Sequence, residues 1–361
     1  MAVALQAKCP VLALGAPGIG KTTQAQALAK SLGLHMETII ASLREPSDFA
    51  GLPIIHNGLV TLATPDWAQR LIEAGGGIAF FDEITTAPPA VQAALLRVVH
   101  ESVVGSVKLP NVAYLAAANP PEQAAGGWEL AAPLANRFCH LHWNVDSAAW
   151  IDGMLQGFPA PTFPRVPEGW ESLQLESQVA VAGFIRAKSQ LLLQVPSNDA
   201  AAGKPWPSPR SWHMASRLMA ANKAANAGPD SEIALVAGCV GDGVGIEFLN
   251  WRNALDLPDP EELLKAPEKF EMPERGDRSF TILASVAAAV AANVTKQRYL
   301  AAWTIFRIAA KKGQKDVAAA SVKALAQAGR GKAFLQDKDV REAQKENLTP
   351  FLEILKSAGL I

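Results

Sequence analysis

The chain has 361 residues, of which 49% are hydrophobic, with 33 Lys and Arg against 34 Asp and Glu. This composition is typical of a globular protein with two domains or one large domain. The formal net charge of -1 provides no overall attraction to nucleic acid or to an acidic membrane, although a local basic patch is invisible in such a sum. We therefore do not expect nucleic acid as the main partner.

The cysteines and the apolar runs indicate the compartment. Cys9, Cys139 and Cys239 lie far apart without a Cys-x-x-Cys spacing, so neither a disulfide framework nor a zinc ribbon is expected. The first apolar stretch lacks a preceding basic region and runs directly into a glycine-rich loop, unlike a signal peptide. The longest apolar run, residues 281–294, is shorter than the roughly 18 residues of a membrane span and predicts a buried helix. We expect a cytoplasmic protein without a membrane span.

Residues 1–145 alternate short apolar runs with helical patterns. The runs that predict strands are CPVLALG (9–15), METIIA (36–41), GGGIAFFDE (75–83), NVAYLAAANP (111–120) and RFCHLHWNV (137–145). KTTQAQALAKSLG (21–33) and PPAVQAALLRVVHES (88–102) predict helices between them. Strands that are apolar on both faces and alternate with helices predict an α/β fold, in which helices cover both sides of a parallel sheet.

From residue 146 onward the pattern predicts only helices. Long segments rich in Ala and Leu, such as those at 177–194, 210–226, 231–240 and 298–313, lack the period-2 alternation of a strand. A Pro-rich loop at 196–209 interrupts them, GDGVG at 241–245 is expected to be a turn between helices, and residues 257–277 separate a further helical group. The predicted division is therefore 1–145, 146–256 and 257–361.

The stretch GAPGIGKTT, residues 15–23, fits the phosphate-loop pattern G-x-x-x-x-G-K-[ST] from Gly15 to Thr22, between a predicted strand and a predicted helix. In this motif backbone N–H groups and the helix N-terminus face the phosphates, Lys21 reaches the β and γ phosphates, and Thr22 can hold Mg²⁺. The sequence therefore predicts that ATP and Mg²⁺ bind here. The residues expected to bind them are Gly15, Pro17, Gly18, Ile19, Gly20, Lys21, Thr22, Thr23 and Asp82.

In the stretch IAFFDEI, residues 78–84, four apolar residues are followed by the two acids Asp82 and Glu83. Asp82, at the carboxyl end of a buried strand, can order the water shell of the Mg²⁺ that Thr22 holds. Glu83 can orient or deprotonate the attacking water, which favours an ATPase, although the same two acids could instead cap the helix that follows Pro88. Asn119, at the end of the next strand, can bond the γ-phosphate or the lytic water, but an asparagine before proline is also an ordinary turn former.

The stretches GAPGIGKTT, IAFFDEI, APPAVQAALLRVVHES and LAAANPPEQ, followed by LANRF, resemble the AAA+ ATPases, and among them the MoxR-like group. The resemblance covers about residues 10–142, with weaker support to about 220. It implies a P-loop NTPase core (1–145), a helical lid (146–256) and a C-terminal extension (257–361). It also implies a ring, expected to be a hexamer, that remodels or activates a protein client or a von Willebrand factor A domain partner.

By the same resemblance, the catalytic set is Glu83, Asn119 as sensor 1, Arg137 as the arginine finger and Arg210 as sensor 2 on the lid. Arg137 stands just ahead of a strand, where it could reach the nucleotide of the next subunit, or it could form a surface salt bridge. Arg210 would start a helix, which is an unfavourable end for a cation unless phosphate offsets the cost, and a solvated arginine is the alternative.

The sequence departs from the family at four positions. Thr85 and Thr86 replace the usual Asn-Arg pair, Arg97 replaces an acid, and Asn136 replaces the aspartate before the finger. These changes put in doubt how subunits would signal to one another. Residues 41–67 resemble the family's insert, which would face a partner or a pore, although a simple loop and hairpin explains them equally well.

Two other functions stay open at this stage: a DNA-associated AAA+ motor, and a binding module that uses nucleotide as a switch with little turnover. A metal site at Cys139, His140 and His142 is not expected, because strand alternation places the cysteine on the face opposite the two histidines.

Overall fold

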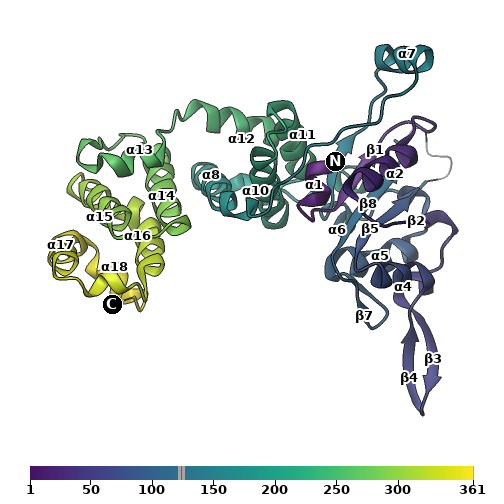
Figure 1. Ribbon diagram of the computed structural model, residues 1–361, viewed down its shortest axis with the longest axis horizontal. Helices are drawn as coiled ribbons and strands as arrows, with labels where there is room; N and C mark the ends of the chain where they lie inside the picture. The colour runs from purple at the N-terminus through teal and green to yellow at the C-terminus, as the bar shows by residue number, and fades with distance from the viewer. Residues whose placement is uncertain (121–122, 124–126, 361) are drawn as a thin grey trace. The chain divides into compact units, whose positions relative to one another are not determined.

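The computed structural model describes residues 1–120, 123 and 127–360, and it divides into two compact units. The first unit comprises residues 1–170 and 191–246, and the second comprises residues 171–190 and 247–361 (Figure 1). The assignment of residues 1–145, 146–256 and 257–361 to a core, a lid and an extension stays a prediction.

Five parallel strands form the central sheet of the first unit, in the order β2-β5-β8-β1-β9. The strands are β1 Val11–Leu14, β2 Met36–Ile40, β5 Gly77–Asp82, β8 Val112–Ala118 and β9 Cys139–His142. β8 is buried along its whole length and β5 along all but its last residue, as expected for central parallel strands. The five predicted strands are therefore present, and the α/β prediction is confirmed.

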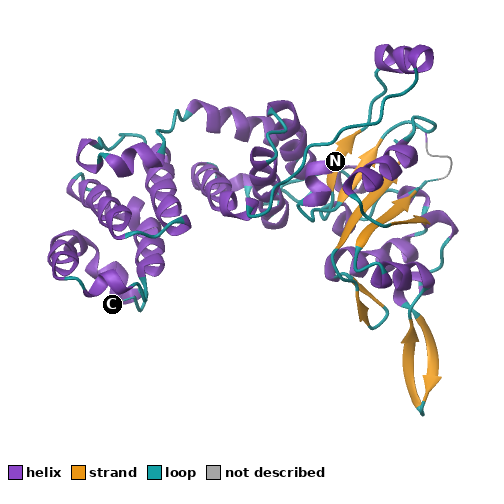
Figure 2. Cartoon of the chain, viewed as in Figure 1, coloured by secondary structure: helices purple, strands orange, loops and turns teal. Residues whose placement is uncertain are grey.

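Helices flank this sheet (Figure 2). The helices of the core are α1 Ala2–Gln6, α2 Lys21–Leu32, α3 Ser47–Ala50, α4 Asp66–Glu73, α5 Pro89–Glu101 and α6 Ala132–Ala135. On one face, four aromatic side chains pack together in the core. Phe81 stacks on Tyr114 with 6.2 Å between ring centroids, and Phe49 and Trp67 meet Phe81 edge-on. Buried aromatic pairs of this kind stabilise a fold by about 0.5–1.5 kcal/mol each beyond their area burial.

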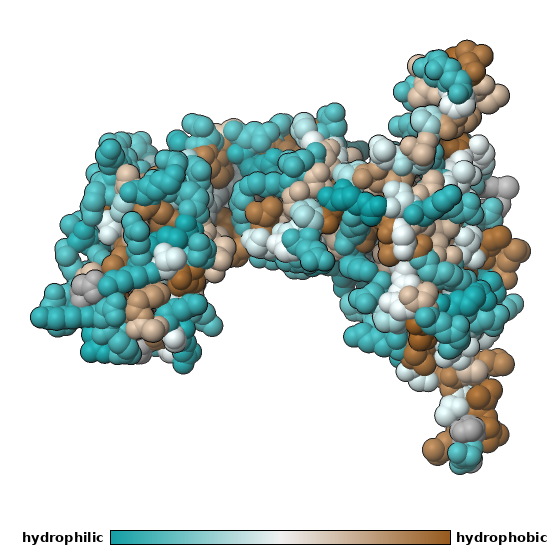
Figure 3. Space-filling model, in the orientation of Figure 1, coloured by the Kyte–Doolittle hydropathy of each residue, from teal (hydrophilic) through white to brown (hydrophobic). Residues whose placement is uncertain are grey.

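The insert at residues 41–67 forms α3 and an antiparallel hairpin, β3 Leu52–His56 and β4 Leu59–Ala63. Asn57 and Gly58 make the two-residue turn, both with positive φ, which is the preferred geometry for such a hairpin. Figure 3 shows apolar residues gathered on this hairpin. Its exposed apolar side chains are Leu52, Ile54, Ile55, Leu59 and Val60. A second, shorter hairpin pairs β6 Val103–Val104 with β7 Val107–Lys108.

A helical arm follows β9. Trp143 donates its backbone N–H to the Leu14 carbonyl oxygen at 2.6 Å, and after this anchor the chain enters α7 Ser147–Gln156. The side chain of Asp146 caps α7 by accepting backbone N–H bonds from its first turn. The arm is also anchored at its other end, where Arg165 donates to the Ser31 carbonyl oxygen. α7 exposes Trp150, Ile151, Met154 and Leu155.

Three further helices complete the first unit: α9 Asp199–Ala202, α10 Pro209–Ala224 and α11 Pro229–Val240, which contacts β9. α10 begins with a capping box, in which Ser208 and Ser211 satisfy each other's backbone N–H groups. Asn136 ties this cap to the core, because its side chain donates to the Trp206 carbonyl oxygen and accepts from the Ser208 hydroxyl at 2.7 Å.

The predicted turn at residues 241–245 is wrong beyond its first residue. Gly241, with φ of 87°, ends α11, and α12 Asp242–Ala254 begins at the next residue. The physical reason is that Asp242 suits the positive end of a helix, and that Gly245 lets α12 approach α11 closely, because a Cβ there would lie 2.9 Å from Cα of Ala237.

The second unit is helical. Besides most of α12 it contains α8 Gln174–Ala187, α13 Pro260–Lys265, α14 Gly276–Ala292, α15 Lys296–Lys311, α16 Lys315–Gly329, α17 Lys338–Leu348 and α18 Leu352–Ser357. Its core centres on Trp303 and Phe306, and the predicted buried helix at 281–294 is largely α14. No strand follows His142 in the described part of the chain, as predicted. None of the described helices is long and apolar enough to cross a bilayer.

Candidate active site

The phosphate loop joins β1 to α2 at the carboxyl edge of the sheet. Gly18 and Gly20 adopt φ of 78° and 85°, a left-handed conformation that glycine takes without strain, and Gly20 is the N-cap of α2. Gly15 is required for a different reason, since a Cβ there would lie 2.6 Å from the Trp143 carbonyl oxygen and 2.6 Å from a methyl of Ile19. The loop therefore leads into the N-terminus of α2, a position that favours an anion.

Lys21 joins this loop to the neighbouring strand. Its ammonium group donates to the carbonyl oxygens of Gly15 and Ala16 at 2.7 and 2.9 Å, and to Oδ1 of Asn119 at 2.9 Å. These bonds occupy all three of its donors. Burial lowers the pKa of Lys21, and the nearby Asp82 carboxylate opposes that shift. The two residues expected to meet the γ-phosphate, Lys21 and Asn119, are thus in direct contact.

Thr22 and Asp82 form a second pair. The Thr22 hydroxyl donates to Oδ2 of Asp82 at 2.8 Å, although the two residues lie 60 positions apart in the sequence. A hydroxyl and a carboxylate beside a phosphate loop form the oxygen-only donor set that Mg²⁺ prefers. The residues present therefore fit the predicted magnesium site.

Glu83 follows Asp82 in an unusual backbone conformation. Its φ is 56°, in the left-handed region that non-glycine residues rarely adopt, and its N–H donates to Oδ1 of Asp82 at 3.0 Å. Its exposed carboxylate accepts a hydrogen bond from the Ser42 hydroxyl at 3.0 Å. The alternative that Asp82 and Glu83 cap α5 is wrong, because no side chain caps that helix, whose N-cap is Pro88. Strain of this kind often marks a functional position.

Sequence reasoning missed Ser42. No local motif marks it, because it approaches Glu83 only through the pairing of β2 with β5, in which Ile40 lies opposite Asp82. It is a polar contact for the predicted catalytic carboxylate.

Arg137 and Arg210 lie at the opposite edge of the sheet. Arg137 stands two residues before β9, whose first residue pairs with Val11 at the start of β1. The four residues of β1 therefore separate Arg137 from the phosphate loop of its own chain by about 13 Å along the strand direction. This placement therefore gives Arg137 no contact with a phosphate held by the loop of its own chain.

The two arginines are close to each other. Burial lowers the pKa of Arg137, and repulsion from Arg210 lowers it further. Arg137 donates to the Pro133 carbonyl oxygen at 2.6 Å, and its buried Nε has no partner among the described residues. Arg210 is exposed in the first turn of α10, as predicted, where the helix dipole disfavours a cation. Neither guanidinium forms an ion pair with a described acidic side chain, so the salt-bridge alternative for Arg137 finds no partner here.

The side chains of three of the four family departures have hydrogen-bond partners, whereas the buried hydroxyl of Thr85 has none among the described residues. Arg97 pairs with Glu101 at 3.2 Å and also donates to the Gly105 carbonyl oxygen, whereas Asn136 is only 3% exposed and holds the cap of α10. The hydroxyl of Thr86 donates to the Glu83 carbonyl oxygen. Glu122, the glutamate that follows the Asn-Pro pair in the family pattern, lies outside the described residues.

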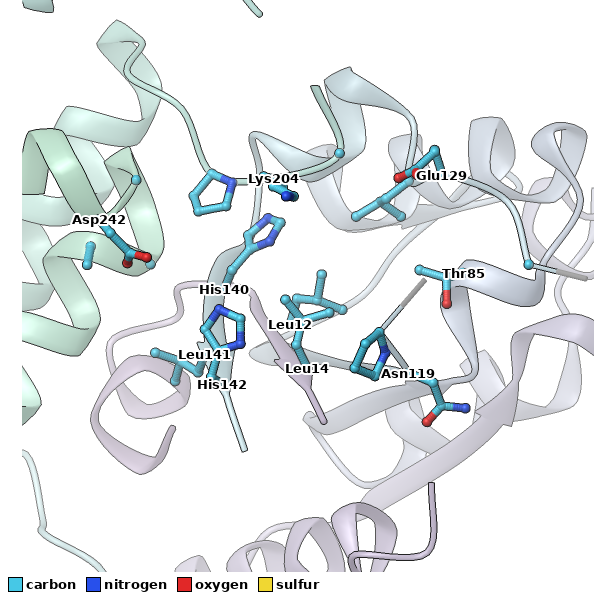
Figure 4. A pocket seen from close by; sticks show the side chains of 18 of the residues that line it. Leu12, Leu14, Thr85, Asn119, Glu129, His140, Leu141, His142, Lys204 and Asp242 are labelled. Atoms are coloured by element: carbon cyan, nitrogen blue, oxygen red, sulfur yellow. The ribbon is translucent and has the colours of Figure 1, made fainter. Parts of the chain in front are cut away.

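A cavity of about 650 Å³ adjoins Asn119 within the first unit (Figure 4). Leu12, Leu14 and Leu141 form part of its apolar wall, and Lys204 and Asp242 contribute charged groups. It begins at the residue expected to sense the γ-phosphate and extends along β9 to the start of α12.

His140 lies on the wall of this cavity and is 3% exposed. Its Nε2 donates to the Ala135 carbonyl oxygen at 2.9 Å, and burial lowers its pKa to about 4. Cys139 instead bonds to the Leu235 carbonyl oxygen, and no three potential ligands gather into a metal site among the described residues. His140 is therefore a neutral structural histidine.

Titration of His140 should make stability depend on pH. Its pKa is about 4 in the folded chain against 6.5 ordinarily, so its contribution is complete above pH 6.5 and is lost as pH falls toward 4. The expected loss is about 2 kcal/mol at pH 5 relative to pH 7.5. Urea unfolding at both pH values measures it, and His140→Gln should remove this part of the pH dependence. The exposed His213→Gln variant is the control, and an equal loss in all three proteins would contradict the expectation.

A parallel sheet that presents a phosphate loop, an Asp-Glu pair and an asparagine at one edge defines a P-loop nucleotide-binding core. In agreement, residues 10–140 match the family model described as "ATPase family associated with various cellular activities (AAA)". This core is thus similar to AAA ATPase domains.

Two individual proteins are also similar. Uncharacterized protein YeaC of Bacillus subtilis is 31% identical over 140 residues, which cover 37% of this chain and 42% of YeaC. The match therefore spans less than half the length of that curated relative. A solved structure from Cytophaga hutchinsonii, provisionally described as an ATPase, is 19% identical with a TM-score of 0.45, covering 69% of this chain and 86% of that chain.

Proposed function

We propose that this protein is a MoxR-like AAA+ ATPase that hydrolyses MgATP and uses the energy to remodel or activate a protein partner. The observation that carries the proposal is the convergence of Lys21, Thr22, Asp82 and Asn119 at one edge of the sheet, linked by hydrogen bonds of 2.8–2.9 Å. Glu83 stands beside them as a carboxylate available to a water molecule.

Each residue has a distinct role in this proposal. Lys21 exchanges its carbonyl and Asn119 partners for the β and γ phosphates, and Asn119 then contacts the γ-phosphate or the attacking water. Thr22 and Asp82 hold Mg²⁺, which would neutralise phosphate charge when bound. Glu83 accepts a proton from the attacking water or orients it. The Ser42 hydroxyl occupies only Oε2 of Glu83, so Oε1 remains available to the attacking water.

We propose that Arg137 and Arg210 act together on the nucleotide of a neighbouring subunit. Both lie at the amino edge of the sheet, away from their own phosphate loop. Two mutually repelling cations that pair with no acid among the described residues suit a phosphate group. Because each site would then need a neighbour, the active form is a ring, for which the family resemblance suggests a hexamer.

Exposed apolar surfaces support a protein client or a von Willebrand factor A domain partner. The β3–β4 hairpin and α7 both present large apolar side chains to solvent (Figure 3). Exposed patches of this kind mark interaction sites. We also propose a cytoplasmic location, consistent with the free, buried thiols of Cys9, Cys139 and Cys239.

The test is the release of inorganic phosphate from MgATP by the purified chain, measured across a range of protein concentrations. Hydrolysis should rise more steeply than protein concentration, since assembly completes each site. A chain that binds MgATP but releases no phosphate at any concentration would be a nucleotide-dependent switch and not a motor.

A further inference from the structure

The C-terminal helices carry an unbalanced charge. Residues 296–356 contain thirteen Lys and Arg but only six Asp and Glu, a net charge of +7. Since the whole chain has a net charge of -1, the remaining residues carry -8. The near-neutral total therefore conceals a basic region in the second unit.

Ion pairs occupy several of the acids in this region. Asp337 pairs with Lys296 at 2.8 Å, Glu346 pairs with Arg307, and Glu342 lies 4.0 Å from Lys338. Between residues 309 and 332, Asp316 is the only acid, against six lysines and arginines. Local pairing thus leaves an excess of positive charge around α16.

The excess lies on one side of α16. Lys315, Lys323 and Arg330 are exposed, and none forms an ion pair with a described side chain. At about 100° per residue they fall within about 80° of the helix circumference, and at 1.5 Å per residue they stand about 12 and 10 Å apart along its axis. Ala318, Val322 and Leu325 are fully buried in the core that α16 shares with α14 and α15. The three cations therefore lie on one exposed flank of the helix, which they share with the exposed Asp316.

More positive charge lies at both ends of this row. Lys311 and Lys312 precede α16, Lys332 follows it, and all three are exposed. We call the six residues, Lys311, Lys312, Lys315, Lys323, Arg330 and Lys332, the α16 basic face.

We propose that the α16 basic face binds the phosphate backbone of duplex nucleic acid without sequence preference. The axial spacing of its cations is close to the roughly 12 Å width of the major groove of B-DNA, so neighbouring cations can meet phosphates on its two rims. Exposed Ala320 and Ala324 lie beside this row of cations, and their small side chains leave room for a nucleic-acid backbone to approach. Such contacts release counterions, which gives a sequence-independent affinity that depends on salt.

Two features favour a duplex over other polyanions. α16 has no aromatic residue, so it offers no platform on which single-stranded bases could stack. It also exposes no large apolar side chain that could insert between lipid headgroups, as an interfacial helix requires. The α16 basic face contains none of the residues predicted to bind ATP. A result that shows no duplex binding would therefore leave the proposed ATPase activity unaffected.

The experiment measures binding of the full chain to a fluorescent 30-base-pair duplex of mixed sequence by anisotropy, from low to physiological salt. The test variant is K315E/K323E/R330E. Its matched control, K30E/K108E/K269E, makes the same charge change at exposed lysines elsewhere. Wild type and control should bind alike, while the test variant should bind at least tenfold more weakly. Its plot of log affinity against log salt should be shallower by about 3, one unit for each lost phosphate contact.

Circular dichroism and phosphate release should be the same in all three proteins, which excludes misfolding as the cause. Equal duplex binding by the test variant and wild type would overturn the proposal. So would a wild type that binds anionic vesicles or polyglutamate but no duplex, since the basic face would then serve a membrane or an acidic protein.

Discussion

Steady-state ATP hydrolysis should fall about 100- to 10,000-fold when Glu83 is replaced by Gln, because this range is typical for the loss of a general base. MgATP binding should remain, since Lys21, Thr22 and Asp82 keep their contacts. Glutamine has nearly the same size and can still bond to Ser42, so the fold should not change. Phosphate release and the affinity for a fluorescent ATP analogue measure the two effects separately.

Glu45→Gln is the matched control for this experiment. Glu45 is exposed, lies only three residues after Ser42, and makes no side-chain contact with the site. Its variant should hydrolyse ATP at the wild-type rate. If Glu83→Gln also retained wild-type turnover, Glu83 would not be the general base, and the proposed motor would lose its central residue.

Arg137→Ala should lower hydrolysis about 1,000-fold or more, the effect typical of removing an arginine finger. The distinguishing measurement is made on mixtures. An Arg137→Ala subunit retains an intact Glu83, and a Glu83→Gln subunit retains an intact Arg137. Where the two stand side by side in the correct order, one complete site forms, so mixing two inactive proteins should restore hydrolysis.

The mixing experiment separates action within a chain from action between chains. If Arg137 served its own nucleotide, no mixture could assemble a complete site, and activity would stay at the level of the separate variants. Arg97→Ala is the control, because it removes a half-exposed arginine that pairs with Glu101 on α5. That variant should be active alone. Arg210→Ala should behave like Arg137→Ala in mixtures if the two arginines act together.

The elements that could be predicted from sequence are those whose chemistry is local. A phosphate loop requires its glycines, lysine and threonine within eight residues, and the buried strands around it are apolar on both faces. Asp82 and Asn119 could be predicted because Asp82 ends one such strand and Asn119 follows another, and parallel strands bring their carboxyl ends to a common edge. Local spacing and strand direction were therefore sufficient for the fold class and for the residues brought together there.

The contacts that escaped prediction all depend on packing between distant segments. Ser42 reaches Glu83 through strand pairing, and Asn136 holds Ser208, which is 72 residues away. That second contact places Arg210 beside Arg137, a placement that neither residue's neighbours in the sequence indicate. The start of α12 was missed because glycine lowers helix propensity, and the close packing of Gly245 on Ala237 of α11, which overrides that propensity, depends on tertiary structure.

Strand β9 connects two parts of the proposed reaction site, namely Arg137 near its amino end and the phosphate loop near its carboxyl end. Its amino end begins two residues after Arg137, and beyond its carboxyl end Trp143 is bonded to Leu14 and packed against Gly15 of the phosphate loop. A hydrogen-bonded strand is stiff along its length. A shift of the loop would therefore be transmitted along β9, which is paired with β1, to Arg137, the arginine that we propose serves the adjacent protomer. In the proposed ring, this strand would link each nucleotide site to the arginine that serves the next one.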